Sequence, residues 1–158
     1  MKKAHIDSVP EDCWQSPAGK YQLIRKHLSL AVGGVKDVGE WGGGHPFDVE
    51  LAKLPPGKSN FPLHRHSAQS EFYLVFSGTG LLHGEGDPQT LRAGDIVFAA
   101  PGEAHRIENT GPSDLEYLVV SDQPRADICH YPETKKYFLK PERVTLSGDQ
   151  ADYFEVGD

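Results

Sequence analysis

Two histidines and one glutamate lie close together near the middle of the chain. One residue separates His64 from His66, and Glu71 follows after the small polar residues 67–70. Alternate side chains of a β-strand point to the same face, so the two imidazoles project together. Residues 67–70 have the composition of a tight connection, after which a returning strand can bring Glu71 to both imidazoles. Neutral imidazoles and a carboxylate suit a divalent Fe, Mn, Ni, Zn or Cu ion.

A fourth candidate ligand, His105, lies in a second predicted hairpin over residues 101–109. A histidine pair with one intervening residue is by itself commonly a surface or capping feature. The addition of Glu71 and His105 favours a metal site, because a carboxylate that begins an apolar strand needs a partner or a metal once it is buried. The alternative partner for Glu71 is an arginine, either Arg92 or Arg106.

These residues belong to two motifs that resemble those of the cupin superfamily. The first motif is carried by Gly57, His64, His66, Glu71 and Gly78. The second motif is carried by Gly94, Pro101, Gly102, His105 and Asn109. One extra residue precedes His64 and the proline comes one place late, so the departures affect turn residues and no candidate ligand. The resemblance implies a small antiparallel barrel in which one divalent ion (Fe, Mn, Ni or Zn) is bound by His64, His66, Glu71 and His105.

The strand after Glu71 is apolar on both faces. Tyr73 and Val75 share the face of Glu71, so we expect Tyr73 to point into the barrel and line the pocket. The opposite face needs a cover from outside the barrel, and its residues are Phe72, Leu74 and Phe76.

Residues 47–51 alternate between apolar and acidic side chains. Phe47, Val49 and Leu51 alternate with Asp48 and Glu50. This pattern predicts a strand with its apolar face buried and its two carboxylates in water.

The composition favours an all-β fold. The 158 residues include 17 glycines and 12 prolines, and turn signals recur every eight to twelve residues or so. With the cupin resemblance, we expect one domain, 1–158, built as a double-stranded β-helix of jelly-roll type. Its barrel core is expected at 45–121, with an extended N-terminal arm at 1–44 and a C-terminal tail at 122–158. The tail contains aromatic residues that we expect to pack on the outside of the barrel, namely Tyr131, Tyr137, Phe138, Tyr153 and Phe154.

The charge of the chain argues against two classes of partner. Lys and Arg number 16 and Asp and Glu number 23, a net charge of −7, and no basic patch stands out. We therefore expect no nucleic-acid partner and no membrane partner. No apolar run is long enough for a membrane helix, and the N-terminal lysines precede no apolar region, so a cytoplasmic protein is expected. Cys13 and Cys129 are then expected to be free thiols.

Four protein ligands leave open coordination positions for water or substrate oxygens. Small cupins of the kind that this chain resembles include sugar and sugar-phosphate isomerases, dioxygenases and decarboxylases. The sequence therefore predicts a metalloenzyme acting on a small polar molecule, of the sugar or sugar-phosphate isomerase type or the dioxygenase type. The alternative is a non-catalytic protein that binds a carboxylate or a sugar through its metal. The sequence leaves open whether the protein is an enzyme, and no cofactor besides the metal is expected.

Candidate catalytic groups are few. Tyr73 and His45 are the candidates nearest the motifs. Arg65 and Arg106 are offset from the histidines by one residue and so point away from them. A cationic group for a phosphate would have to come from elsewhere, such as Arg25 or Lys26.

We also expect a homodimer, because the outward face of residues 72–76 needs a cover. Cupins, which this chain resembles, commonly pair their barrels through such outer faces, often with exchanged N-terminal segments. Residues 20–32 carry an apolar alternation suited to such an exchange. The competing interpretation is that the aromatic residues of the tail cover the same face within one chain.

Overall fold

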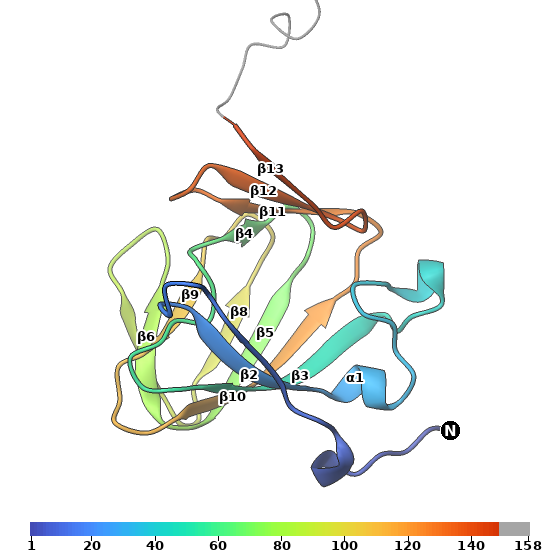
Figure 1. Ribbon diagram of the computed structural model, residues 1–158, viewed down its shortest axis with the longest axis horizontal. Helices are drawn as coiled ribbons and strands as arrows, with labels where there is room; N and C mark the ends of the chain where they lie inside the picture. The colour runs from blue at the N-terminus through green and yellow to red at the C-terminus, as the bar shows by residue number, and fades with distance from the viewer. Residues whose placement is uncertain (149–158) are drawn as a thin grey trace, which may run out of the picture.

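The computed structural model describes residues 1–148, and antiparallel β-strands form most of it (Figure 1). Tyr153 and Phe154, expected to pack on the barrel, lie outside the described residues. The largest sheet has six strands, which in spatial order are β1 (Asp12–Gln15), β2 (Gln22–His27), β3 (Phe47–Leu54), β10 (Leu115–Asp122), β5 (Glu71–Ser77) and β8 (Ile96–Ala99).

Two smaller sheets complete the fold. The first contains β7 (Gln89–Arg92), β6 (Thr79–His83) and β9 (Arg106–Asn109). The second contains β13 (Val144–Ser147), β12 (Lys136–Lys140), β11 (Asp127–Tyr131) and β4 (Arg65–His66). The helical elements are short, namely η1 (Ile6–Ser8), α1 (Leu28–Ala31) and η2 (Glu40–Gly42). None of the helices within residues 1–148 is long and apolar enough to cross a membrane.

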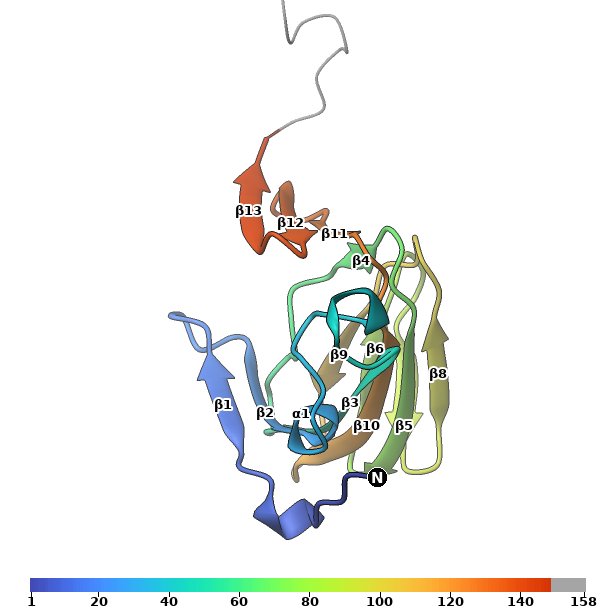
Figure 2. The same cartoon turned by 90° about the vertical axis from the view of Figure 1, so that its right-hand side faces the viewer.

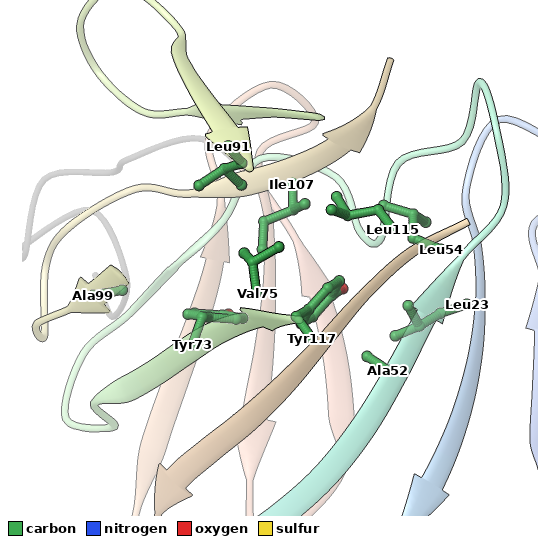
Figure 3. Packing of buried hydrophobic residues seen from close by; sticks show 10 residues of the cluster. All are labelled: Leu23, Ala52, Leu54, Tyr73, Val75, Leu91, Ala99, Ile107, Leu115 and Tyr117. Atoms are coloured by element: carbon green, nitrogen blue, oxygen red, sulfur yellow. The ribbon is translucent and has the colours of Figure 1, made fainter. Parts of the chain in front are cut away.

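The hydrophobic core lies between the six-stranded and the three-stranded sheets (Figure 3). Val75 and Tyr117 from the large sheet meet Leu91 and Ile107 from the small one, and each is at most 3% exposed. Two facing antiparallel sheets around one apolar core form the double-stranded β-helix, so the predicted all-β fold class is confirmed.

Residues 12–15 and 22–27 of the expected N-terminal arm are strands of the large sheet. Strand β2 pairs with β3, and β1 pairs with β2 at the outer edge (Figure 2). The inward residues of β2 are thereby brought into the barrel interior: Leu23 is 2% exposed and belongs to the core.

Strand β3 is turned opposite to the expected orientation. Asp48 is 8% exposed, whereas Phe47 is 49% exposed. Ala52 and Leu54, which share the face of Asp48, are in the hydrophobic core. The acidic face of this strand therefore points into the barrel, where Ser29 and Asp48 are hydrogen bonded. Alternation alone located the strand but could not decide which face is buried.

The C-terminal strands cover the open end of the barrel and not its side (Figures 1 and 2). Strand β11 pairs with β4, which places the hairpin of β11 and β12 above the loop that contains His66. The expectation that the tail packs on the outer face is wrong for the described residues. Phe76, Ile96 and Phe98 on that face remain 49%, 64% and 61% exposed.

Two motif residues have structural roles. Gly78, between β5 and β6, has a φ of +84°, and a Cβ there would lie 2.5 Å from the Asp114 carbonyl oxygen. Asn109 is fully buried, and its Nδ2 donates to the carbonyl oxygens of Leu54 and Ser113 at 2.7 and 2.8 Å. Its Oδ1 accepts from the Gly111 amide at 2.9 Å. Asn109 thus links the β9–β10 turn to β3.

We predict that Asn109→Ala lowers the free energy of unfolding by about 2–4 kcal/mol, because it leaves two carbonyls and one amide without their buried partner. Thr110→Ala, at the exposed neighbouring position, is the control and should change it by less than about 0.5 kcal/mol. Urea titrations of the three proteins measure the difference. Equal midpoints for the Asn109 variant and the wild type would contradict the assigned role.

Candidate metal centre

Backbone pairing brings the four candidate ligands together. His64 and His105 form an antiparallel bridge, in which the His105 amide donates to the His64 carbonyl at 2.8 Å and the His64 amide donates back at 3.2 Å. His66 is in β4, and its carbonyl accepts from the Gly102 amide at 2.7 Å. Gly102 has a φ of +90°, a conformation that favours glycine. Glu71 begins β5 beside this loop.

The side chains converge at the mouth of the barrel. One ligand atom from each of the four residues lies within 4.8 Å of the other three. Nε2 of His105 is 2.7 Å from Oε2 of Glu71, and Nε2 of His66 is 3.8 Å from the same oxygen. Each histidine is only 5% exposed. The arginines that the sequence offered as partners for Glu71 have other partners, since Arg92 pairs with Asp95 and Arg106 with Glu133.

Every imidazole is already hydrogen bonded through its other nitrogen. Nδ1 of His64 is 2.9 Å from the Pro62 carbonyl oxygen, and Nδ1 of His105 is 3.1 Å from the Glu103 carbonyl oxygen. Nδ1 of His66 is 2.6 Å from Oδ2 of Asp127. When Nδ1 donates in these contacts, Nε2 keeps a free lone pair, which is how histidines bound to metals are held. The donor set therefore fits a divalent transition-metal ion.

The electrostatics of the cluster keep His64 and Glu71 in ligand form, whereas the hydrogen bond with Glu71 raises the pKa of His105 despite burial. Burial and the neighbouring His105 lower the pKa of His64 to about 3, so this imidazole stays neutral. Burial opposes ionisation of Glu71, but the hydrogen bond with His105 and the charges of His66 and His105 outweigh it. The pKa of Glu71 therefore lies below its ordinary value, and the carboxylate is ionised. Neutral imidazole and ionised carboxylate are the forms that bind metals.

Tyr73 lies in the wall of the site, as its parity with Glu71 predicts. Its hydroxyl donates to Oε2 of Glu71 at 2.6 Å. Burial, and after it the charge of Glu71, raises the pKa of Tyr73 well above its ordinary value. A hydroxyl held protonated and donating to a ligand oxygen orients Glu71, and this geometry does not favour Tyr73 as a base. His45, the other catalytic candidate, lines a separate groove beside α1 and β3.

A cavity of about 270 Å³ extends from the cluster across the barrel interior. Four of the described residues in its wall are cationic, namely Arg25, Lys36, Lys140 and Arg143. Two described carboxylates, Glu50 and Glu71, face the same space. A larger groove of about 490 Å³ lies on the outside of the large sheet and contains none of the four cluster residues.

The far wall of the cavity is built on a ring of alternating charges. Arg25 pairs with Glu50 at 3.2 Å and with Asp12 at 3.1 Å. His27 contacts the same two carboxylates, at 2.7 Å from Glu50 and 3.1 Å from Asp12. The hydrogen bond with Glu50 raises the pKa of His27 despite burial, which favours its cationic form. The Nε of Arg25 is buried and has no hydrogen-bond partner among residues 1–148.

The sequence predicted that the four cluster residues come together but missed most of the cavity wall. Of the two cations suggested for a phosphate, Arg25 lines the cavity, while Lys26 donates to the Ile6 carbonyl on the other face of β2. Glu50 was missed because its strand is inverted relative to the expectation. Lys140 and Asp127 were missed because no motif connects the tail to the site. The one sequence signal that could have pointed to Asp127 is its position as a carboxylate at the start of a strand.

Comparisons with known proteins agree with this geometry. A family model described as Cupin domain matches residues 50–121. An oxalate-binding protein of Thermotoga maritima is 47% identical over 68 residues, which are 43% of this chain and 55% of that protein. The chain spans between 42% and 62% of the length of the curated relatives it matches.

Two solved structures resemble the whole barrel. A putative sugar phosphate isomerase from Acidithiobacillus ferrooxidans has a TM-score of 0.77 at 26% identity, over 93% of this chain and 89% of that one. A predicted oxalate decarboxylase from Thermotoga maritima has a TM-score of 0.61 at 30% identity, over 76% of this chain and 97% of that one. The segment matched by the family model contains all four residues of the cluster. The chain therefore belongs to the cupin superfamily.

Proposed function

We propose that the protein is a metal-dependent enzyme of the sugar-phosphate isomerase type, acting on a small anionic substrate. One observation carries the proposal: a single cavity connects the His64, His66, Glu71 and His105 cluster to the cationic wall formed around Arg25. A ligand in this cavity can place an oxygen at the cluster and an anionic group at the opposite end. Among the described residues, Arg25, Lys140 and Arg143 are paired with carboxylates, so Lys36 is the wall cation whose charge favours an anion.

A bound divalent ion would polarise a carbonyl or hydroxyl oxygen of the substrate as a Lewis acid. Arg25 would hold the anionic group through its guanidinium charge. Isomerisation also needs a group that accepts and returns a proton. Glu71 belongs to the ligand cluster, so Glu50 is the remaining carboxylate among the described wall residues. Its pKa is lowered because His27 and Arg25 outweigh the effect of burial, so Glu50 is ionised and can accept a proton.

The second candidate function is metal-dependent binding of a small dicarboxylate. It is supported by the oxalate-binding relative, which is 47% identical over 68 residues. The cavity favours the first candidate, because its cations extend from Arg25 to Lys140 on β12, and an oxalate bound at the cluster would leave the far cations unused.

A ligand panel separates the two candidates. Calorimetry on metal-loaded protein should show binding of a phosphorylated aldose or ketose and much weaker binding of the same sugar without phosphate. Interconversion of the two isomers, followed by NMR, then shows turnover. Binding of oxalate alone, with no turnover of any sugar phosphate, would replace the enzyme by the binding protein. Iron in the purified protein together with oxygen consumption would favour the dioxygenase type.

We predict that one divalent metal ion binds per chain and that His64→Ala and His105→Ala each weaken its binding at least about tenfold. Each variant removes one donor from a buried four-residue set. Elemental analysis of protein purified without chelator measures occupancy. The control is His83→Ala, because His83 pairs with Glu108 outside the cluster. Full metal content in both cluster variants would exclude the proposed centre.

We predict that Arg25→Lys lowers the affinity for the sugar phosphate about tenfold, because a lysine keeps the charge but loses the fork geometry of the guanidinium. Metal content and affinity for the unphosphorylated sugar should stay the same. The matched control is Lys26→Ala, which removes the adjacent cation from the other face of β2. An Arg25→Lys variant with unchanged phosphate affinity would place the anion elsewhere.

We also propose that the protein is a homodimer that pairs through the outer face of the large sheet. Phe72 faces Phe98 and Leu74 faces Ile96 across the β5–β8 pair. None of the C-terminal residues described covers Ile96 and Phe98, which are more than 60% exposed. A contiguous exposed apolar face of this kind is typical of an interface.

Phe98→Glu should therefore convert a dimer into a monomer, because it places a charge in the centre of the apolar face. Light scattering should give twice the 17.4 kDa chain mass for the wild type and the single mass for the variant. The control is Leu146→Glu, at an apolar β13 position of similar exposure. A wild-type mass of one chain at micromolar concentration would rule out the dimer.

We expect the protein to work in the cytoplasm, as predicted from the sequence. Cys13 and Cys129 are free thiols in the structure, which is compatible with a reducing compartment. Cys129 lies in the cavity wall, where burial raises the pKa of its thiol to about 11. A thiol held protonated is a poor nucleophile, so a catalytic role for Cys129 is not proposed.

A further inference from the structure

A buried carboxylate outside the matched cupin domain contacts one of the four cluster residues. Asp127 begins β11 and is 2% exposed. Its Oδ2 lies 2.6 Å from Nδ1 of His66, on the side of the imidazole that faces away from the cluster. The family match ends at residue 121, so this contact comes from the C-terminal segment that follows it.

The other two histidines are supported differently. His64 and His105 contact the backbone carbonyls of Pro62 and Glu103, which are near them in sequence. These acceptors are neutral and come from the same loops as the histidines. Among the three imidazoles, His66 is the one whose Nδ1 has a charged acceptor, and a charged acceptor there orients the ring and makes Nε2 a stronger donor to a metal.

Asp127 is itself held firmly. Its Oδ1 accepts from the Ala68 amide at 2.9 Å, from the Gln69 amide at 3.3 Å and from the Ser67 hydroxyl at 3.2 Å. These contacts fix the carboxylate against the loop between β4 and β5.

The carboxylate of Asp127 also connects the loop between β4 and β5 to the hairpin of β11 and β12. Lys140 on β12 lies 4.0 Å from Oδ2 of Asp127 and donates to Oε1 of Gln69 at 2.8 Å. In the adjoining ladder, Cys129 of β11 pairs with His66 of β4. The hairpin of β11 and β12 therefore rests on the loop that contains His66, and its residues Tyr131, Phe138 and Lys140 line the cavity.

We propose that Asp127 is a positioning residue of the metal centre, which holds His66 for coordination and couples metal binding to the docking of the β11–β12 hairpin. This inference rests on the proposed metal binding. Because coupling between two equilibria is reciprocal, metal binding must stabilise the docked hairpin to the extent that docking favours metal binding. The metal thereby also orders the cavity wall contributed by the hairpin, including wall residues that do not touch it.

The test compares two identical substitutions at neighbouring carboxylates. Asp127→Asn removes the charge behind His66 and should weaken Zn²⁺ and Mn²⁺ binding about 10- to 100-fold. The control is Asp122→Asn, because Asp122 accepts from the Ser70 amide at 2.8 Å on the same loop but does not contact His66. Competition with a chromophoric chelator measures both affinities, and the control should remain within about twofold of the wild type.

Hydrogen exchange gives a second readout that does not depend on activity. In the wild type, Zn²⁺ should slow exchange of the amides in β11 and β12, and this protection should shrink in Asp127→Asn. If Asp127→Asn fails to fold, Ser67→Ala takes its place, because it leaves His66 intact and removes one donor to Asp127 together with the acceptor of the Ile128 amide. It should weaken metal binding and hairpin protection in the same direction by a smaller factor.

The possible outcomes distinguish this inference from the proposed function. A wild-type protein that binds no divalent metal overturns the metal centre and this inference together. A wild type that binds metal beside an Asp127→Asn variant of equal affinity overturns only the role of Asp127. Unchanged protection of β11 and β12 on metal binding overturns the coupling to the hairpin.

Discussion

The structure depends on the burial of one carboxylate, Glu71, inside an apolar barrel. An isolated buried carboxylate is strongly unfavourable and must be paired or bound to a metal. Here His105 and the Tyr73 hydroxyl lie 2.7 and 2.6 Å from the same Glu71 oxygen, and His66 lies 3.8 Å from it. The rings around Glu71 must be held at fixed positions. The backbone bridge between His64 and His105 does this for two of them. A centre preorganised in this way is one that a divalent ion can complete with little rearrangement.

The same constraint explains the second polar region in the barrel. Glu50 points inward from β3, where it would be as unfavourable as Glu71 without partners. Its partners are cationic, Arg25 and His27, and they come from β2, which lies outside the matched cupin domain. The barrel interior therefore has two charged regions of different chemistry, one suited to a metal ion and one containing a guanidinium. A cavity between two such regions selects ligands with two polar ends.

The sequence predicted the parts of the site that follow from local periodicity. Strand parity placed Tyr73 beside Glu71, and the motif resemblance placed His105 in the same cluster. The orientation of β3 could not be predicted in the same way, because a strand with one apolar and one acidic face is equally regular in either orientation. Which face is buried was decided by Arg25 and His27, which lie far from Glu50 in sequence. The contact of Asp127 with His66 is a tertiary pairing of the same kind, so no local pattern could reveal it.

The division between the matched domain and its flanking strands has a functional meaning. All four candidate ligands lie within residues 50–121, whereas Arg25, Lys36, Lys140 and Arg143 lie outside them. The candidate metal cluster thus belongs to the matched domain, and the other charged groups of the cavity wall come from the segments before and after it. Fold alone does not determine function, because related barrels can keep one centre and change its surroundings. Under the proposed function, the choice of substrate would depend on β2 and on the β11–β12 hairpin, and these are the segments in which related chains should be compared.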